Sequence, residues 1–301
     1  MTQLKFPFQT PRALVMGEPG SGKTDSLTTW IEAGKELFVI VTEPDGVASL
    51  LDSCERRKLP VDKLHWASAR PAVPGWDALE EMTKSIGTMT FEQIAQIKTG
   101  IGKEQTRKPA WNLIQTGHDF VCERTGKSYG PVDKFDDSCV VAIDSLSGVS
   151  LIAWMLTVGY KAGSHQGDWG SAMNYIEQVV LKFSNDCKCY FTLTAHIERE
   201  VSELTGSSRI MVSTLGRKLP PKIPRFFSEV ILAKRTLKGT TPVFTWSTVD
   251  SMADLKNRAL PVGTDLTPSF VPIVRAYERR LKLAGIPAPA ATGTSQLKAA
   301  T

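Results

Sequence analysis

A glycine-rich segment near the start of the chain has the residue types and spacing of a phosphate-binding loop. Residues 17–24 read GEPGSGKT, which fits G-x-x-x-x-G-K-[ST] at every fixed position. Glycines let such a loop wrap around an anion, and the helix that follows presents its positive end to the same anion. Lys23 would add a full charge for the outer phosphates, and the Thr24 hydroxyl would be a ligand of Mg²⁺. The predicted phosphate-binding residues, with ATP and Mg²⁺ as the expected ligands, are Gly17, Glu18, Pro19, Gly20, Ser21, Gly22, Lys23 and Thr24.

A second candidate metal ligand lies at the end of a later apolar segment. Residues 140–148 read VVAIDSLSG, a run of β-forming residues that ends at Asp144. A carboxylate at such a strand end is suited to hold Mg²⁺ directly or through water. The alternative is that Asp144 caps the helix that begins near Leu146. The residue after Asp144 is Ser145, not glutamate, so a carboxylate that orients the attacking water must come from elsewhere.

Glu43 is the candidate for that role. It follows the apolar run LFVIVT and precedes Pro44. A carboxylate that activates water must lie near the terminal phosphate, and the carboxyl end of a neighbouring parallel strand would place it there. The alternative is a solvated turn residue before Pro44.

Strand and helix patterns alternate through the first 235 residues, which predicts an α/β fold with a mostly parallel sheet flanked by helices. Strands are expected at 12–17, 37–43, 64–69, 139–146, 189–196 and 228–235, with an edge or hairpin strand at 242–249. Helices are expected at 23–34, 46–58, 76–86, from 149 to 160 and from 167 to 183.

Residues 84–136 interrupt this alternation and are interpreted as an inserted helix and hairpin, the hairpin turning at Thr125-Gly126. The Pro/Ala/Thr-rich segment 286–301 is expected to be a flexible tail. We therefore expect one domain over 1–285.

Composition excludes little and fits an ordinary globular chain. The 301 residues are 42% hydrophobic and 22% charged, with a formal net charge of +5, which permits a polyanionic partner without requiring one. The apolar run from Val149 is about 12 residues long, too short to span a bilayer. Five scattered cysteines predict reduced thiols and a cytoplasmic location; a metal pair at Cys187 and Cys189 is the disfavoured alternative.

The glycine loop, the Thr-Glu that closes the second strand and the Asp-Ser that closes the later strand resemble the core of RecA-type ATPases. The resemblance covers about residues 12–260 and is nearest to short AAA-family ATPases of bacteriophages, some of them annealing or recombination proteins. It implies that Glu43 orients the attacking water. It also implies that His196, where the family usually has a polar residue such as glutamine, senses the terminal phosphate. The alternative is a histidine at a strand end that makes only a local hydrogen bond. Lys256 and Arg258 match cations that reach a neighbouring subunit's nucleotide, which implies a homo-oligomer. The alternative for these two residues is an exposed basic turn.

The segment between 197 and 227 corresponds in that family to loops that contact DNA. It is basic and ends in two aromatic residues, Phe226 and Phe227, a combination suited to single-stranded DNA. The alternative is a solvated loop with both phenylalanines in the core. The candidate DNA-binding residues are Arg209, Arg217, Lys218, Lys222 and Arg225.

The function expected from the sequence is ATP hydrolysis coupled to single-stranded DNA in phage recombination or replication, in the host cytoplasm, with a single-strand binding protein as a further partner. A nucleotide-gated scaffold and a P-loop kinase without DNA binding stay open as alternatives. A ring helicase is less favoured, because only eleven residues precede the first expected strand. Ring and filament assemblies are both open.

Overall fold

The computed structural model describes residues 9–70, 110–115, 119–158, 164–201, 206 and 208–286. The helix expected at 76–86 and the tail from 287 onward lie outside these residues, so both stay predictions. The single domain over 1–285 likewise stays a prediction.

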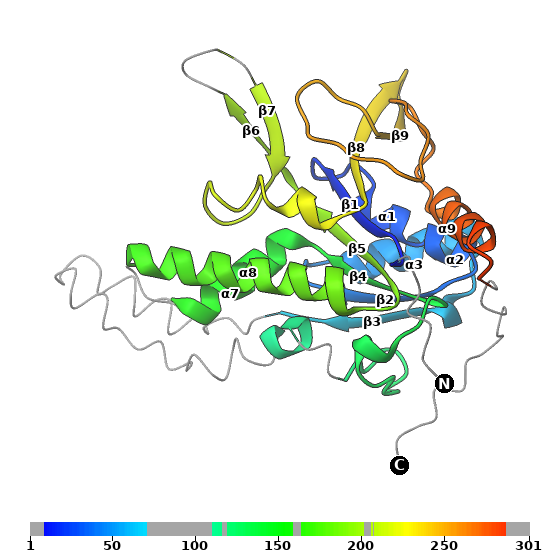
Figure 1. The fold of residues 1–301 in the computed structure, drawn as a ribbon, viewed down its shortest axis with the longest axis horizontal. Helices are drawn as coiled ribbons and strands as arrows, with labels where there is room; N and C mark the ends of the chain where they lie inside the picture. Colours follow the sequence, from blue (N-terminus) through cyan, green and yellow to red (C-terminus); the bar gives the residue numbers. More distant parts are fainter. Residues whose placement is uncertain are drawn as a thin grey trace.

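The centre of the protein is a seven-stranded sheet with the order β3-β2-β4-β5-β1-β8-β9 (Figure 1). Its strands pair in parallel except for β8 and β9, which form an antiparallel hairpin at one edge. The strands are β1 (Arg12–Gly17), β2 (Glu36–Val41), β3 (Leu64–Ser68), β4 (Cys139–Asp144), β5 (Tyr190–Ala195), β8 (Glu229–Lys238) and β9 (Thr241–Ser247). The predicted mostly parallel sheet and the hairpin strand at its edge are confirmed.

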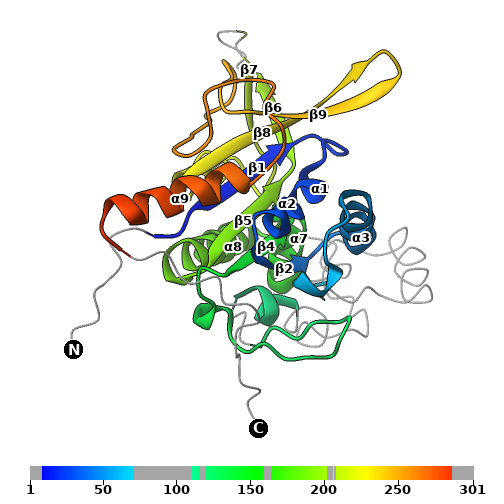
Figure 2. The ribbon, with the colours of Figure 1, turned by 90° about the vertical axis from the view of Figure 1, so that its right-hand side faces the viewer.

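Helices cover both faces of the sheet, which is why the central strands are apolar on both sides. Along β1, Leu14 faces one hydrophobic core and Val15 the other, because successive side chains of a strand point to opposite faces. One core includes side chains of α7 and α8, and the other includes those of α1, α2, α3 and α9 (Figure 2). These helices are α1 (Lys23–Leu27), α2 (Thr29–Glu32), α3 (Gly46–Arg57), α7 (Leu146–Thr157), α8 (Gln166–Asp186) and α9 (Val271–Leu283). The predicted α/β fold class, a mostly parallel sheet flanked by helices, is confirmed.

The helix expected over 23–34 is interrupted, and this part of the prediction is wrong. Thr28 separates α1 from α2, and its hydroxyl donates to the Asp25 carbonyl oxygen at 2.9 Å. The Thr28 amide also donates to that carbonyl, at 3.3 Å, which is the tighter three-residue spacing. A threonine hydroxyl that bonds the preceding turn competes with the regular helical pattern, so the helix tightens at this residue.

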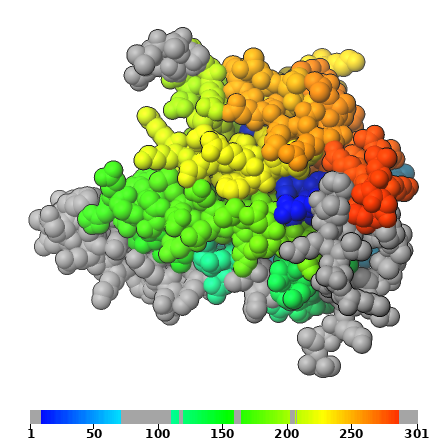
Figure 3. Space-filling model, viewed as in Figure 1, coloured from blue at the N-terminus to red at the C-terminus, as the bar shows by residue number. Residues whose placement is uncertain are grey.

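The segment after β5 contains two strands that the sequence reading placed in loops. β6 (Ile197–Val201) and β7 (Ser208–Val212) pair in antiparallel register and project from the main body (Figures 1 and 3). Most of β6 is exposed, so it lacks the apolar alternation by which a half-buried strand is recognised. A short 3-10 helix, η3 (Ile223–Phe226), then leads into β8.

The described part of the expected insertion contains the predicted hairpin. Val121 and Ser128 form an antiparallel bridge, and Gly126 adopts a φ of 67° in the turn between them. Two further 3-10 turns precede β3 and β4, η1 (Val61–Lys63) and η2 (Val132–Lys134).

All five cysteines are buried and free of disulfide bonds. Among the described residues, no group of three or more His, Cys, Asp or Glu side chains is placed to share a metal ion, Cys187 and Cys189 included. No helix in the described ranges combines the length and apolar character needed to cross a membrane.

Candidate nucleotide site

Four neighbouring strands end at the same edge of the sheet, and each delivers part of the candidate site. Their order in the sheet is β2-β4-β5-β1. Glu43 follows β2, Asp144 ends β4, His196 follows β5, and β1 leads into the loop 17–24. The parallel register fixes this grouping: Val41 pairs with Asp144, and Met16 pairs with Ala195. Residues far apart in sequence therefore meet at one edge, as the carboxyl ends of parallel strands do in other ligand sites.

The loop 17–24 has a backbone that only glycine accommodates at three positions. Gly20 and Gly22 have φ angles of 70° and 82°, in the left-handed region. A Cβ on Gly17 would lie 2.5 Å from the Ala233 carbonyl oxygen, so β8 packs directly against the loop. Ser21 Oγ is buried and has no hydrogen-bond partner within the described chain. A tight loop with an unsatisfied donor at the start of α1 fits a bound phosphate.

Lys23 lies across the mouth of the loop. Its Nζ donates to the carbonyl oxygens of Gly17 and Glu18, each at 2.9 Å, and lies 3.4 Å from His196 Nδ1. Burial lowers the pKa of Lys23, and the carboxylates of Asp144, Glu43 and Glu18 oppose that shift. The ammonium is thus partly removed from water and placed where it gains most from an anion in the loop.

Asp144 and Thr24 form the candidate metal pair. The Thr24 hydroxyl donates to Asp144 Oδ2 at 2.9 Å, and the Thr194 hydroxyl donates to Oδ1. Ser145, not Asp144, is the N-cap residue of α7, and it makes no side-chain cap bond, so the helix-capping alternative for Asp144 is not observed. Burial raises the pKa of Asp144, with the two hydroxyl bonds opposing. A carboxylate beside a hydroxyl fits Mg²⁺, which usually keeps several waters and takes phosphate oxygens as its other ligands.

Glu43 is held beside Asp144 by contacts between the ends of β2 and β4. The Thr42 amide donates to the Asp144 carbonyl at 2.8 Å. The Thr42 hydroxyl accepts from the Ser145 amide at 2.7 Å and donates to the Ser145 carbonyl at 3.0 Å. These hydrogen bonds require glycine at position 148, because a Cβ there would collide with the Thr42 side chain. The two strand ends are therefore fixed relative to each other, and Glu43 is the next residue.

Within the described part of the chain, the hydrogen bonds to the Glu43 carboxylate all end on one oxygen. Ser145 Oγ donates to Oε1, and His196 Nε2 lies 2.9 Å from the same atom. The His196 bond holds the pKa of Glu43 below its ordinary value, with Ser145 and Lys23 acting in the same direction and burial opposing. The solvated-turn alternative is not observed, since the side chain is about two-thirds buried.

His196 connects the glutamate to the lysine. A carboxylate can only accept, so Nε2 carries the proton toward Glu43, and Nδ1 is left as the acceptor that faces Lys23. The His196 carbonyl also accepts from the Ser213 amide at 2.7 Å, which ties the histidine backbone to the segment just after β7. A change at the phosphate loop therefore has a physical route to the β6–β7 hairpin.

Three hydroxyl residues of the site were missed by the sequence reading. Thr42, Ser145 and Thr194 each bond a functional carboxylate or fix the strand that carries one. Their signal was present but weak: each lies within two residues of a predicted site residue at a strand end.

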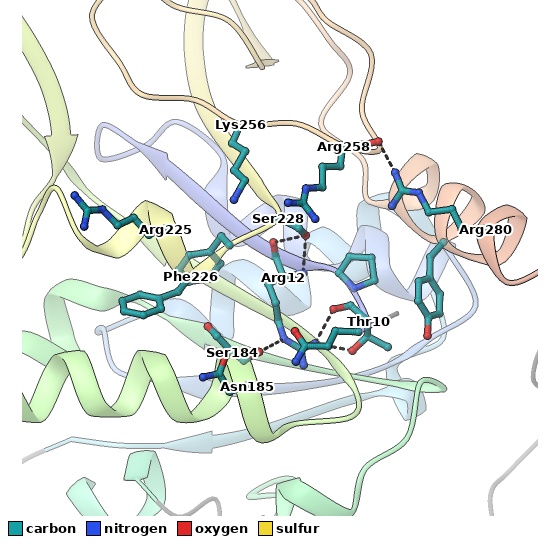
Figure 4. Close-up of a pocket in the computed structure, with 14 residues that line it drawn as sticks. Thr10, Arg12, Ser184, Asn185, Arg225, Phe226, Ser228, Lys256, Arg258 and Arg280 are labelled. Atoms are coloured by element: carbon teal, nitrogen blue, oxygen red, sulfur yellow. Dashed lines mark hydrogen bonds between the residues drawn. The ribbon is translucent and has the colours of Figure 1, made fainter. Parts of the chain in front are cut away.

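Lys256 and Arg258 lie beside the start of β8, at the other end of the strands from the loop 17–24. Lys256 pairs with Val230, and the Arg258 amide donates to the buried Glu229 carboxylate at 3.1 Å, both at the start of β8. The loop 17–24 packs against Ala233, four residues or about 13 Å further along that strand. The two cations line a cavity of about 500 Å³ together with Arg225 and Arg280 (Figure 4). They therefore face away from the phosphate loop of their own chain.

The five candidate DNA-binding residues do not form one group. Arg209 pairs with Asp254, and Lys222 pairs with Glu177 at 2.9 Å. Arg225 lines the cavity just described, while Arg217 and Lys218 are exposed. The adjacent aromatic residues turn inward: Phe227 is buried and Phe226 packs against the core, as the alternative reading expected.

Comparisons with known proteins give distant structural likenesses. The chain is similar to the flagellar accessory protein FlaH from Methanocaldococcus jannaschii, with a TM-score of 0.35 and 9% identity over 85% of this chain and 83% of that one. It is also similar to the KaiC-like protein PH0186 from Pyrococcus horikoshii OT3, with a TM-score of 0.33 and 10% identity over 83% and 82% of the two chains. No protein-family model matches, and no curated protein matches. Likenesses at these scores say nothing about activity or partners, which must be argued from the site itself.

Proposed function

We propose that the chain is a Mg²⁺-dependent ATPase with a RecA-like core. One observation supports this above the others: five candidate side chains meet at the loop 17–24. Lys23 contacts His196, which contacts Glu43, and the Thr24 hydroxyl donates to Asp144. They supply a cation for the terminal phosphate, a metal pair, a carboxylate for water and a polar residue that reports on the phosphate. A structural role for any one of these residues would not require the others.

The triphosphate of ATP would lie in the loop, with its terminal phosphate toward Lys23. Thr24 and Asp144 would hold Mg²⁺, which neutralises charge on the β- and γ-phosphate oxygens when bound. The two hydrogen bonds to Glu43 end on Oε1, so Oε2 would accept a hydrogen bond from a water molecule. This hydrogen bond would direct the lone pair of the water oxygen at the γ-phosphorus. A new oxygen–phosphorus bond forms, the bond to the bridging oxygen breaks, ADP leaves, and the water proton passes to Glu43. The depressed pKa keeps Glu43 ionised for this task.

The proposal extends to an assembly and a partner. Because Lys256 and Arg258 face away from their own phosphate loop, they would serve the nucleotide of a neighbouring copy, with ATP between subunits. Arg217 and Lys218 are the candidate residues that remain exposed for single-stranded DNA. The physiological role would be phage recombination or replication, in the host cytoplasm, together with a single-strand binding protein.

ATP turnover with Mg²⁺, measured with and without single-stranded DNA, tests this function. Stimulated turnover supports the DNA-linked ATPase. Turnover that ignores DNA supports hydrolysis but removes DNA as the partner. Tight ATP binding without turnover would favour a nucleotide-gated scaffold, and transfer of phosphate to a small acceptor would favour a kinase.

A further inference from the structure

The β8–β9 hairpin extends past the end of β1 and runs over the phosphate loop (Figure 2). Gly17, the last residue of β1, pairs with Ala233, and β8 then continues for five more residues before β9 returns. In the antiparallel register, Arg235 is directly opposite Phe244. Side chains at directly opposite positions project to the same face of a hairpin, so these two residues act on the same neighbour.

That neighbour is the loop 17–24. Arg235 Nη1 lies 3.1 Å from where a Cβ on Gly20 would be, and Phe244 Cδ1 lies 3.0 Å from the same position on Gly22. Both glycines also have positive φ, so the hairpin side chains occupy space that opens only because the loop lacks side chains there. Arg235 and Phe244 thus lie beside the place where a phosphate chain would approach the N-terminus of α1.

The positive charge of Arg235 has no acidic partner among the described residues, which favours binding of an anion. The two nearby acids are used by other cations: Glu18 pairs with Arg199 at 3.1 Å, and Asp250 pairs with Lys234 at 3.0 Å. No ion pair involves Arg235 among the described residues, although its guanidinium lies beside a loop that already carries Lys23. A guanidinium in such a place matches phosphate oxygens well.

Sheet order gives the direction of the nucleotide. Glu43, Asp144 and His196 follow β2, β4 and β5, which all lie on one side of β1, whereas β8 and β9 lie on the other side. A triphosphate with its terminal phosphate at the carboxylates therefore extends its nucleoside end toward the hairpin. Phe244, whose ring contacts the Gly22 position, is 41% exposed at the end of that path.

We propose that Arg235 binds the phosphate chain of the nucleotide in its own subunit and that Phe244 stacks on the base. This assignment rests on the proposed nucleotide-binding function and adds the part of the site that recognises the nucleoside. An aromatic face accepts any base, because every base has a π-face, so Phe244 provides affinity without strong discrimination.

Titration of ATP and of inorganic triphosphate, both with Mg²⁺, separates the two roles. Phe244→Ala is expected to weaken ATP binding about tenfold and to leave inorganic triphosphate unchanged, while Phe244→Tyr keeps wild-type affinity. Arg235→Ala is expected to weaken both ligands about tenfold. Lys238→Ala and Leu237→Ala alter exposed residues of the same hairpin and should change neither ligand.

The outcomes distinguish this assignment from the proposed function. If Phe244→Ala weakens ATP and triphosphate equally, Phe244 only supports the loop and the stacking role is wrong. If Arg235→Ala binds both ligands as tightly as the wild-type chain does, the phosphate role of Arg235 is wrong while the proposed function stands. A wild-type chain that binds neither ligand overturns the proposed function, and this assignment with it.

Discussion

Ser145 donates a hydrogen bond to Glu43, and this contact joins the ends of two neighbouring strands. Ser145 stands where many nucleotide hydrolases carry a glutamate after the metal-binding aspartate, and the carboxylate that it contacts comes from the end of β2 instead. The serine therefore positions the residue that we propose takes over the glutamate's task. His196 bonds the same oxygen of Glu43, so both of these hydrogen bonds end on Oε1.

Glu43→Gln should retain ATP binding and lose at least about 100-fold in turnover, because an amide cannot take the proton of the attacking water. Steady-state phosphate release and ATP titration measure the two effects separately. Glu55→Gln, an exposed glutamate on α3, is the matched control and should behave as wild type. Unchanged turnover in Glu43→Gln would remove Glu43 from the mechanism.

Lys23→Ala should abolish measurable binding of Mg²⁺-ATP, because the variant loses the cation that we propose contacts the terminal phosphate. Thermal unfolding gives the readout: a ligand at 100 times its Kd stabilises the folded state by about 2.7 kcal/mol, and the variant should show none of this gain. Lys58→Ala, an exposed lysine at the end of α3, controls for loss of a positive charge. ATP-dependent stabilisation that survives in Lys23→Ala would contradict the phosphate assignment.

Mg²⁺ binding should weaken as the pH falls, and Asp144 is the expected cause. Burial raises the pKa of Asp144, so its carboxyl takes up a proton at a higher pH than an exposed aspartate would, and a protonated carboxyl is a poor ligand for Mg²⁺. The same shift means that ionised Asp144 costs folding free energy when no Mg²⁺ is bound. Asp144→Asn should therefore be no less stable than wild type without Mg²⁺, and should lose the added stabilisation that Mg²⁺ gives with ATP. A Mg²⁺ response that persists in Asp144→Asn would place the metal elsewhere.

The sheet and the central residues of the site could be predicted because short sequence patterns mark each strand and the residue that follows it. Each apolar run followed by a glycine, acid or histidine proved to be a parallel strand, and parallel strands must gather their ends at one edge. Glu43 and Asp144 were therefore expected as neighbours although 100 residues separate them.

The remaining features depend on contacts that no local pattern shows. The β6–β7 hairpin is mostly exposed on β6 and so lacks the apolar alternation that marks a strand. Thr28 interrupts the first helix through a side-chain bond to Asp25, which an amphipathic pattern cannot reveal. The basic residues of segment 197–227 were grouped by sequence alone, whereas ion pairs with Asp254 and Glu177 distribute them over separate places.

Mixing two inactive variants should restore activity if the nucleotide lies between subunits. Lys23→Ala removes the phosphate cation, and the double variant Lys256→Ala/Arg258→Ala removes the cations that face away from their own loop. Loss of such a trans-acting cation can cost roughly 10³–10⁵ in rate. Each variant alone should be inactive, whereas mixed assemblies would contain some sites with both an intact loop and intact trans cations.

Arg279→Ala, an exposed arginine on α9, should be active alone and serves as the control for charge loss on that side of the protein. If the mixture stays inactive although the variants co-assemble in size-exclusion chromatography, Lys256 and Arg258 do not act on a neighbour's nucleotide.

Charge reversal at Lys218 and Lys222 should weaken single-stranded DNA binding and flatten its salt dependence. The two lysines differ in a useful way, because Lys218 is exposed and has no ion pair among the described residues, whereas Lys222 pairs with Glu177. Each lost phosphate contact lowers the slope of log affinity against log salt by about 0.7 for a single strand. Lys218→Glu should therefore lower the slope more than Lys222→Glu, whose lysine must first leave its carboxylate. Fluorescence anisotropy over a salt series measures the slopes, with Lys58→Glu, just after α3, as the matched reversal away from this segment. Equal slopes in wild type and Lys218→Glu would mean that DNA, if it binds, uses another surface, and the exposed arginine next to it, Arg217, would lose its assignment as well.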